Sequence, residues 1–478
     1  MISAMSAASI VILLINPGYI FDTSYRLSFV AIISVGFFAT KYINNTCFLS
    51  EKLKLKFQSG FKDRLYNIFI PGFLNSIIIS SWAYFVSLPI LISCYYETAI
   101  YSIILNIIVI PLMSVLLICA VGMLLLTDKV KILTLIFYII IKFILNFYKE
   151  ICLFLVQIGV GRVNLGKPSA AGVVLYYILL LFICLYCGKR RVIVRTVSLA
   201  VCILIMTVRI QTPGLYMLDV GQGDCGVFIN SNRNVYIFDG GSSSKRNVGK
   251  QRIIPFLKFY GIKRIEAIFI SHPDEDHMNG IVELINEAKE ECLSIRHIYV
   301  YSDSLENGDY QELQNVVRKS KLGLEIVEGI NSGYELEDGE LSIKCIYPES
   351  KSELGSTNDA SLVLSLKYGE FLCLETGDTT KEAEQEMCRK GLLEAVDVLK
   401  VAHHGSNTST AQTFIDVIRP SVALISAGKN NRYGHPHKET IETLDEANVI
   451  MFATKEEGQI TVKITEGGYK YSISGFVK

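Results

Sequence analysis

The feature that most constrains this chain is an apolar run that is too long for an ordinary core helix. Residues 101–126, from Tyr101 to Leu126, contain no charged side chain. About 20 mostly apolar residues in helical form span the hydrocarbon core of a bilayer. The run therefore predicts a membrane-spanning helix. Further apolar stretches predict additional spans or buried segments at residues 5–18, 27–43, 68–97, 132–158, 170–187 and 196–210.

Charge divides the chain into two unlike halves. Residues 1–210 hold 18 Lys and Arg but 6 Asp and Glu, whereas residues 211–478 hold 28 and 40. A basic, apolar half before an acidic, charge-rich half is typical of a membrane part joined to a water-exposed part. We expect a transmembrane helical domain at 1–210 and a soluble domain at 211–478. This composition excludes an ordinary soluble enzyme and a disordered chain.

Basic loops predict the orientation of the chain. Loops 51–64, 127–131 and 188–195 are rich in Lys and Arg, which favour the cytoplasmic side. The last span then leads outward, so we expect a multi-pass protein of the cell membrane with an extracytoplasmic C-terminal domain. Pro71, Pro89 and Pro111 lie inside apolar stretches. A neighbouring helix or cavity water must satisfy the carbonyl that each proline frees, and we favour simple kinks over a transport role.

From Pro213 onward the pattern changes to short strands that alternate with helices. This interleaving predicts an α/β layered fold. The twelve cysteines are scattered and form no paired CxxC pattern, so we expect neither a disulfide framework nor a thiolate metal site. Strands are predicted at 215–220, 234–239, 265–270, 341–347, 361–368, 370–378, 396–404 and 422–428, and helices at 281–291, 380–390, 411–418 and 438–446.

Histidine is concentrated in the second half. All seven histidines follow residue 271, and six form the close pairs His272/His277, His403/His404 and His435/His437. The segment SHPDEDH (271–277) follows a predicted strand, so its two imidazoles and its carboxylates can converge. Mixed nitrogen and oxygen donors suit Zn²⁺ or Mn²⁺. A solvated acidic turn is the alternative for this segment taken alone.

Three further strand ends carry groups of the same kind. Asp378 ends one predicted strand, His403 and His404 end another, and His435 follows a third. If these strands align in one sheet, their tips meet at one edge. We therefore expect a dinuclear metal site, in which two ions about 3.5–4 Å apart lower the pKa of bound water and clamp the attacking and leaving oxygens.

These motifs resemble those of the metallo-β-lactamase superfamily. The segment 272–277 is similar to the HxHxDH motif, with Asp274 in the place of the second histidine. Asp239 in IFDGG resembles the aspartate that braces the metal loop, and Asp378 resembles the bridging aspartate. The resemblance implies an αββα sandwich. Together with DVGQGD (219–224), LKVAHHGS and GHP, the second half resembles the C-terminal domain of ComEC-type competence proteins, which are DNA-uptake channels of transformable bacteria.

The first half agrees with this resemblance. INPGYIFDTSYRLSFVA (15–31), Asn106 and the Ile110-Pro111-Leu112 segment are similar to the family's competence domain. Members of the family usually begin with further membrane helices and an extracytoplasmic OB-like domain. The resemblance here starts inside the competence domain, so we expect a short form of the family.

The resemblance implies a role for each site residue. His272 and Asp274 would hold one metal, Asp276 and His277 the other, and Asp378 would bridge them. One histidine of the His403/His404 pair would complete the second site. His403 is preferred, and His404 is the alternative. Asp276 would also orient the attacking water, and His435 would protonate the leaving oxygen or bind a phosphate. The expected cofactors are two divalent ions, Mn or Zn.

Other residues are expected near the substrate or behind the ligands. Asn358 occupies the stretch in which the superfamily has an additional histidine. As an alternative, the polar side chains of the GQGD turn could only form hydrogen bonds with the backbone of that turn. Nucleotide binding is rejected, because no Rossmann or P-loop helix follows the turn. The residues assigned to this group are Asp219, Gln222, Asp224, Asp239, Asn358 and, if it is not a ligand, His404.

The resemblance implies a component of a DNA-uptake channel for natural transformation. The helices would conduct single-stranded DNA, and the outer domain would act as a nuclease on the strand that is not imported. The implied partners are DNA, membrane lipid, the competence machinery and further copies of the chain as a homo-oligomer. One alternative is a membrane-tethered metallohydrolase of a small envelope phosphodiester or ester. Another is a non-catalytic channel subunit.

Overall fold

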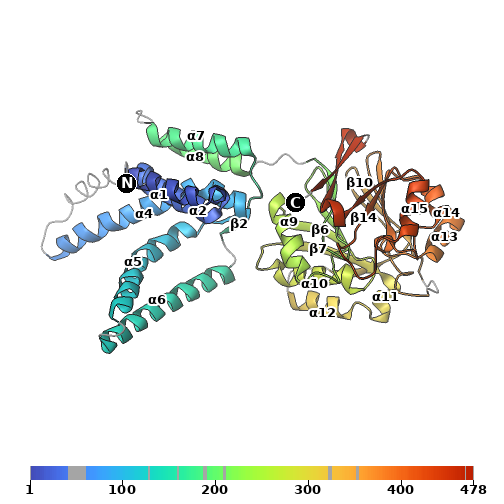
Figure 1. The fold of residues 1–478 in the computed structure, drawn as a ribbon, viewed down its shortest axis with the longest axis horizontal. Helices are drawn as coiled ribbons and strands as arrows, with labels where there is room; N and C mark the ends of the chain where they lie inside the picture. Colours follow the sequence, from blue (N-terminus) through green and yellow to red (C-terminus); the bar gives the residue numbers. More distant parts are fainter. Residues whose placement is uncertain are drawn as a thin grey trace. The chain divides into compact units, whose positions relative to one another are not determined.

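The computed structural model describes residues 2–40, 61–126, 130–158, 161–186, 191–207, 212–320, 326–350, 355–468 and 470–476. The chain divides into two compact units (Figure 1). The first consists of Met1–Arg209 with Lys258–Gly261, and the second of Ile210–Leu257 with Ile262–Lys478.

The first unit is helical. Among the described residues of this unit, three segments are long and apolar enough to cross a membrane: Leu74–Tyr95, Ser102–Leu126 and Lys131–Leu155. Much of each basic loop used to predict orientation, at 51–60, 127–129 and 188–190, lies outside the described residues. The helices are α1 (Ile2–Ile15), α2 (Thr23–Ile33), α4 (Phe61–Tyr95), α5 (Ser102–Leu126), α6 (Lys131–Ile158), α7 (Ala170–Leu185) and α8 (Arg191–Thr207), with the short η1 (Pro17–Phe21), the π-helical η2 (Ser34–Ala39) and the strand pair β1 (Glu97–Ala99) and β2 (Arg162–Asn164).

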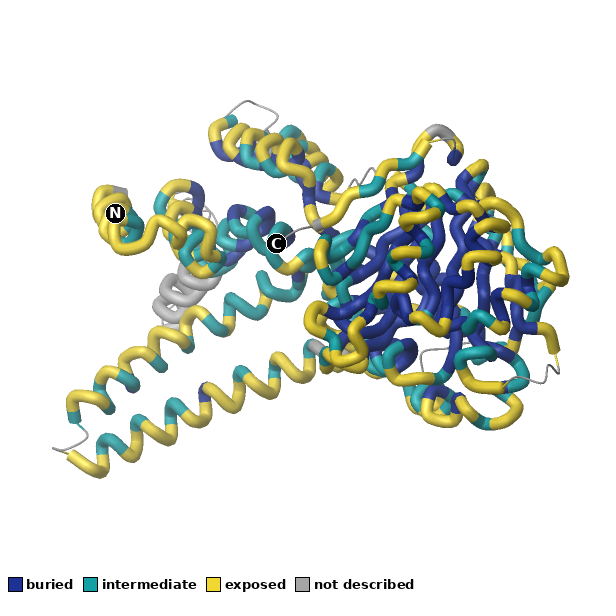
Figure 2. Tube along the Cα trace, turned by 45° about the vertical axis from the view of Figure 1, so that its right-hand side comes forward, coloured by how far each residue is buried: buried dark blue, intermediate teal, exposed yellow. Residues whose placement is uncertain are grey.

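The two units differ in what they expose. The long helices of the first unit present large apolar side chains around most of their circumference, including Leu124 at 79% and Phe143 at 71% exposure. The strands of the second unit are largely buried (Figure 2). A helix that is apolar on all sides is adapted to lipid or to a protein interior, which agrees with the predicted membrane part.

Pro89 in α4 lies opposite two tyrosines of α7. A proline cannot donate a hydrogen bond to the carbonyl four residues earlier, and its ring crowds that turn. The Tyr176 hydroxyl donates to the Phe85 carbonyl at 2.7 Å, and Tyr177 donates to the Val86 carbonyl at 3.0 Å. The neighbouring helix therefore satisfies the carbonyls around the proline, as the simpler interpretation of this residue predicts.

The second unit contains two mixed sheets. Their orders are β17-β16-β3-β4-β5-β6-β7-β8 and β15-β14-β13-β12-β11-β10-β9. The strands of the first sheet are β3 (Gly214–Met217), β4 (Gly226–Ile229), β5 (Val235–Phe238), β6 (Arg264–Phe269), β7 (Ser294–Tyr301), β8 (Ile326–Ile330), β16 (Gln459–Thr465) and β17 (Lys470–Phe476). Those of the second are β9 (Glu335–Asp338), β10 (Leu341–Tyr347), β11 (Val363–Tyr368), β12 (Phe371–Glu375), β13 (Val398–Lys400), β14 (Val422–Ile425) and β15 (Ile450–Ala453).

Helices cover the outer faces of both sheets (Figure 1). In β12, Phe371 and Cys373 pack into the core between the sheets, whereas Leu372 and Leu374 pack against the outer helices. The expected four-layer αββα arrangement is confirmed. The covering helices are η3 (Gly249–Ile253), α9 (Ile254–Tyr260), α10 (Glu275–Ala288), α11 (Ser302–Asn307) and α12 (Gln311–Ser320) on one side, and α13 (Lys381–Lys390), α14 (Gln412–Ile418), α15 (Lys438–Glu446) and the short α16 (Thr454–Glu457) in the other half.

The polar strand ends lie on two sheets rather than one. Strands β5 to β8 are parallel, and so are β12 to β15. Asp239 follows β5 and the SHPDEDH segment follows β6, whereas Asp378 follows β12 and the two adjacent histidines follow β13. The expectation of a single sheet edge was wrong in this respect. The same groups converge because the carboxyl ends of two facing sheets lie together.

The helix predicted at 281–291 begins earlier. α10 starts at Glu275, with Asp274 as its N-cap residue, and it ends at Ala288. Glu275 and Asp276 therefore lie in its first turn, where negative side chains are stabilised by the exposed backbone N–H groups. The regular spacing of apolar residues begins only at Ile281. The sequence pattern therefore placed the start of this helix too late. His277 consequently projects from a helix and not from a loop.

Candidate metal centre

Asp239 braces the loop that follows β6. Its Oδ1 accepts the Ser271 backbone N–H at 2.7 Å, and its Oδ2 accepts the Ser271 hydroxyl at 2.8 Å. The same Oδ2 lies 2.9 Å from His277 Nδ1. An acceptor at Nδ1 fixes the proton there and leaves Nε2 free to bind a cation, as carboxylates behind metal-bound histidines do. Asp239 thus orients His277 and the start of its loop.

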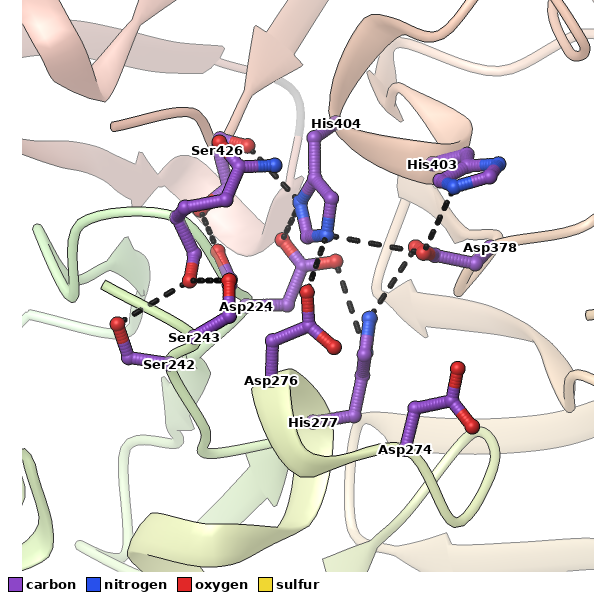
Figure 3. A network of polar contacts seen from close by, with 12 residues as sticks. Asp224, Ser242, Ser243, Asp274, Asp276, His277, Asp378, His403, His404 and Ser426 are labelled. Carbon is purple, nitrogen blue, oxygen red and sulfur yellow. Dashed lines mark hydrogen bonds and ion pairs between the residues drawn. The ribbon is translucent and has the colours of Figure 1, made fainter. Parts of the chain in front are cut away.

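Asp378 lies at the middle of the cluster (Figure 3). Its Oδ1 is 3.3 Å from His277 Nε2, and its Oδ2 is 3.6 Å from His404 Nε2. His403 Nε2 lies 3.7 Å from the same Oδ2. One carboxylate therefore faces three imidazoles, which is the position that the resemblance assigns to a bridging group.

His404 lies deeper in the cluster than His403. The His404 side chain is 2% exposed, and its Nε2 is 3.5 Å from Asp276 Oδ2. The His403 side chain is 25% exposed, and its Nδ1 is 3.1 Å from the Thr408 hydroxyl. His404 Nδ1 is 3.1 Å from the Ser426 carbonyl, so this nitrogen carries the proton and Nε2 is the free donor atom. The geometry favours His404 as the ligand over His403, which the sequence analysis preferred.

The backbone at this pair is unusual. Both His403 (φ 50°) and His404 (φ 55°) adopt left-handed conformations, and so does Asp239 (φ 56°). For residues with a Cβ each such conformation costs on the order of 1–3 kcal/mol and persists only where the surroundings enforce it. These are three of the eleven non-glycine residues with positive φ among the described residues, and the side chains of all three contact the cluster.

The SHPDEDH segment supplies three further groups. His272 is buried, and its Nε2 is 3.6 Å from Asp274 Oδ2. The His272 and His277 rings lie 4.1 Å apart between centroids. Asp274 is half-exposed and makes none of the contacts marked in Figure 3, whereas Asp276 points toward His404. The structure therefore pairs His272 with Asp274 as expected, but it brings Asp276 to His404 from the facing sheet.

Asp224 and Lys400 lie behind the imidazoles. Asp224 is buried, its Oδ2 pairs with the Lys400 ammonium, and its Oδ1 lies 3.6 Å from His404 Nδ1. Asp224, His277, Asp378 and His404 each place one candidate ligand atom within 4.8 Å of the others. Asp224 was expected near the site, but Lys400 was not, because a lysine inside an apolar strand pattern carries no local signal of its partner.

Gln222 connects the GQGD turn to His435. Its amide oxygen accepts the Gly428 N–H at 3.2 Å, so its amino group faces His435 Nδ1, also at 3.2 Å. His435 Nδ1 is then the acceptor, and Nε2 carries the proton. Burial and the neighbouring imidazoles of His404 and His403 lower the pKa of His435 to about 4, so this ring is neutral near pH 7.

Two expected residues lie outside the cluster. Asp219 accepts the Gly221 N–H at 3.1 Å and the Lys245 ammonium at 2.7 Å, which is the local turn role that the sequence left open. Asn358 lies in the turn before β11, where its carbonyl accepts the Ser361 N–H. Ser361 itself reaches the site, because its hydroxyl accepts the Asp378 N–H at 3.2 Å and lies 3.4 Å from His272 Nδ1. No sequence signal distinguished this serine.

The cluster strongly stabilises positive charge. Burial opposes the charged form of Asp378, but His277 and His404 outweigh it and lower the pKa of this carboxyl well below its usual range. Burial likewise disfavours a charged imidazole, yet Asp378 and Asp224 raise the pKa of His404 to about 10. Asp378 and Asp239 also outweigh burial at His277 and raise its pKa.

The donor set fits a divalent metal. Buried polar atoms rarely lack a hydrogen-bond partner, yet five such atoms gather here. Imidazole nitrogen together with carboxylate oxygen is a donor mixture that suits Zn²⁺ or Mn²⁺. The five in this cluster are Asp224 Oδ1, His272 Nε2, His277 Nε2, Asp378 Oδ1 and His404 Nε2.

Comparison with protein families supports both halves of the resemblance. Residues 1–190 match the Competence protein family, and residues 218–429 match the Metallo-beta-lactamase superfamily. The second match contains the SHPDEDH segment, Asp378 and the two adjacent histidines.

Two curated relatives match the chain over different lengths. ComE operon protein 3 of Bacillus subtilis (strain 168) is 28% identical over 480 residues, which cover 96% of this chain and 57% of that protein. Recombination protein 2 of Haemophilus influenzae is 28% identical over 246 residues, covering 51% of this chain and 28% of that protein. The chain therefore spans little more than half, or less, of the relatives that it matches.

Among solved structures, the metallo-β-lactamase fold protein YhfI from Bacillus subtilis is 15% identical, with a TM-score of 0.36. The match covers 55% of this chain and all of that one. The resemblance to ComEC-type competence proteins is confirmed by the two family matches and by the relative that covers nearly the whole chain. The chain carries a Competence protein domain followed by a domain of the metallo-β-lactamase superfamily.

Proposed function

We propose that the second unit is a metal-dependent phosphodiesterase that acts on DNA, and that the chain serves DNA uptake across the cell membrane. The observation that carries the catalytic part is the convergence of five buried, hydrogen-bond-free nitrogen and oxygen atoms from two sheets. Such atoms are costly unless a cation or ligand satisfies them.

Two groups of side chains would hold the ions. His277, Asp378 and His404 surround one position, while His272 and Asp274 lie together beside His277. Two divalent ions, Mn²⁺ or Zn²⁺, would supply Lewis acidity and neutralise the charge that develops on phosphate oxygens. We assign His404 rather than His403 to the ligand set, because its free nitrogen faces Asp378 from a buried position.

Two side chains would act on the substrate and the attacking water. Asp276 is partly exposed beside His404, so its carboxylate can orient a water molecule and accept its proton. His435 is neutral near pH 7 and carries its proton on Nε2, so it can donate a hydrogen bond to a phosphate oxygen. In this form it positions the phosphate, which is a more specific role than the general acid considered from the sequence.

The uptake role follows from the first half. A Competence protein domain with three apolar helices of spanning length supports a membrane channel component, in which residues 1–210 conduct a single strand. We propose that residues 211–478 lie outside the cytoplasm and hydrolyse the strand that is not imported. The partners in this proposal are DNA, membrane lipid, the competence machinery and further copies of the chain.

The test is a cleavage assay with the full chain purified in detergent. Single- and double-stranded DNA are incubated with Mn²⁺ or Zn²⁺, beside Asp276→Ala and Asp378→Asn. Asp338→Asn is the matched control, because Asp338 accepts three hydrogen bonds from Asn230, Asn234 and Tyr236 in the same domain. We expect metal-dependent cleavage that both site variants abolish and that the control retains.

Each alternative predicts a different result in this assay. Hydrolysis of bis(p-nitrophenyl) phosphate without DNA cleavage would contradict the DNA assignment and favour a hydrolase of small phosphodiesters. Metal binding without hydrolysis of either substrate would favour a non-catalytic channel subunit. Equal cleavage by Asp378→Asn and the wild type would remove this cluster from the chemistry.

A further inference from the structure

Lys400 is a buried cation beneath the metal cluster. The residue is 2% exposed at the end of β13, and lysine is rarely so buried without a partner. Its ammonium pairs with Asp224 Oδ2 and donates to the Gly377 carbonyl at 2.8 Å. It also lies 3.9 Å from Asp378 Oδ1. A fixed positive charge therefore lies beside the carboxylate that would face the proposed metal ions.

The position of Asp224 distinguishes it from the other acidic residues. Asp378 approaches His277 and His404 from their Nε2 sides, at 3.3 and 3.6 Å. Asp224 approaches the same two rings from their Nδ1 sides, at 3.8 and 3.6 Å. Asp378 therefore faces the Nε2 atoms that are free to bind a cation, whereas Asp224 faces the Nδ1 atoms of the same two rings (Figure 3).

We propose that Lys400 is a built-in cation that neutralises Asp224 and so limits how much positive charge the cluster binds. This inference rests on the proposed metal-binding function of the cluster. The ammonium pairs with Asp224 Oδ2 and balances the charge of this carboxylate, and its charge near Asp378 opposes a second positive charge there. Lys400 is therefore a positioning residue that sets metal affinity, rather than a group that touches substrate.

The experiment measures Mn²⁺ binding by isothermal titration calorimetry of the full chain in detergent. Lys400→Met keeps the length of the side chain and removes its charge. We expect Mn²⁺ to bind at least tenfold more tightly, because Asp224 becomes an unbalanced carboxylate beside the cluster. Asp224→Asn alone should weaken binding at least fivefold, because it leaves the ammonium unbalanced.

The double variant separates a pairing role from a ligand role for Asp224. If Asp224 only balances Lys400, then Lys400→Met combined with Asp224→Asn should bind Mn²⁺ within fivefold of the wild type. If Asp224 were a ligand, the double variant would bind more than fivefold more weakly. Lys245→Met is the matched control, since it breaks the Lys245–Asp219 pair outside the cluster and should leave Mn²⁺ affinity unchanged.

Several outcomes would overturn the inference. Less than threefold tightening in Lys400→Met, or more than fivefold weakening in the double variant, would do so while leaving the proposed metal binding intact. Circular dichroism checks folding, and Lys400→Gln replaces the methionine variant if that one does not fold. Binding of Mn²⁺ only after Lys400 is replaced would support the inference in its strongest form. If neither the wild type nor Lys400→Met binds Mn²⁺, the inference and the proposed function are overturned together.

Discussion

At the scale of single residues, the orientation of His277 depends on one carboxylate. Asp239 accepts from His277 Nδ1 and from both polar hydrogens of Ser271. In Asp239→Asn one of these acceptor positions becomes an NH₂ group that faces another donor. Loss of a partner behind a metal-bound histidine typically lowers metal affinity about 10–100-fold, and we expect a loss of that size in Mn²⁺ titrations.

Asp338→Asn is again the control for Asp239→Asn. It removes a carboxylate that accepts three hydrogen bonds but lies at an edge strand away from the cluster. It should lower thermal stability without a change in Mn²⁺ affinity. Equal losses of Mn²⁺ affinity in both variants would mean that the effect of Asp239 is general destabilisation.

Glu384 predicts a pH dependence of stability. Burial raises its pKa to about 7, although the backbone N–H groups of Ala411 and Thr410 both donate to it at 2.7 Å. Because the folded pKa exceeds the unfolded value of about 4.5, the folded state binds the proton more tightly. This contribution to stability is complete below pH 4.5 and is lost as the pH rises through 7, and it amounts to about 3 kcal/mol.

The measurement is the unfolding free energy of the second unit between pH 5 and pH 7.5. In Glu384→Gln the decrease over this range should be smaller than in the wild type, because the titrating group is gone. Glu382→Gln changes an exposed residue of the same helix and should keep the wild-type slope. Identical slopes in all three proteins would contradict the assigned role of Glu384.

Site residues that lie close together in the sequence could be predicted from their spacing. Site residues whose side-chain direction depends on the backbone conformation could not. The spacing of SHPDEDH identifies its two histidines and their carboxylates as one group. The choice between His403 and His404 depends on left-handed backbone at both positions, which no spacing reveals. Lys400 was missed because its partner, Asp224, lies 176 residues away in the chain.

At the scale of elements, the start of α10 depends on close approach to a glycine. An added Cβ at Gly241 would lie 2.4 Å from the Asp276 carbonyl carbon and 2.5 Å from the His277 nitrogen. Real Cβ contacts are essentially never this short, so Gly241→Ala must displace the helix start that carries both site residues. We expect at least a tenfold loss of Mn²⁺ affinity.

Gly226→Ala provides the control for this glycine. Its added Cβ would lie 3.4 Å from the Phe238 Cβ, which is an ordinary contact. It should change Mn²⁺ affinity less than threefold in the same titration. A Gly241→Ala protein with wild-type affinity would mean that α10 tolerates the shift.

The contact between α4 and α7 gives a prediction for the membrane part. Tyr176→Phe leaves the Phe85 carbonyl without the donor that compensates for Pro89. Hydrogen bonds between membrane helices contribute about 0.5–1.5 kcal/mol, and we expect destabilisation of this size in detergent unfolding followed by circular dichroism. In a Pro89→Ala background the loss should shrink, because the new backbone N–H can donate to the Phe85 carbonyl. Tyr138→Phe, at an exposed position of α6, is the control.

Elements with strong patterns could be predicted, and edge elements could not. β12 was expected because five consecutive residues, FLCLE, are buried on both faces of the sheet. In the second unit the strands β4, β7 to β9 and β15 to β17 were missed. Of these, β8, β9, β15 and β17 are edge strands, which mix polar and apolar residues, whereas β4, β7 and β16 lie inside the first sheet and depend on pairing with their neighbours. Pairing partners are decided by the whole fold, so the division of the strands into two sheets was not visible in local patterns.

At the scale of the whole molecule, the orientation across the membrane can be tested with a native cysteine. Cys292 is an exposed, free cysteine of the second unit. If residues 211–478 lie outside the cytoplasm, a membrane-impermeant maleimide should label Cys292 in intact cells. Cys292→Ser should lose that label. Labelling that requires disruption of the membrane would place the domain in the cytoplasm.

The pairing of β16 with β3 joins a late segment of the chain to the first strand of the hydrolase domain. Residues 459–465 must therefore be synthesised before the sheet that begins at Gly214 acquires this neighbour. The ribosome must therefore release all of the polypeptide between these two strands before β16 can pair with β3. Until then the backbone N–H and C=O groups along that side of β3 lack the strand partner that completes this part of the sheet.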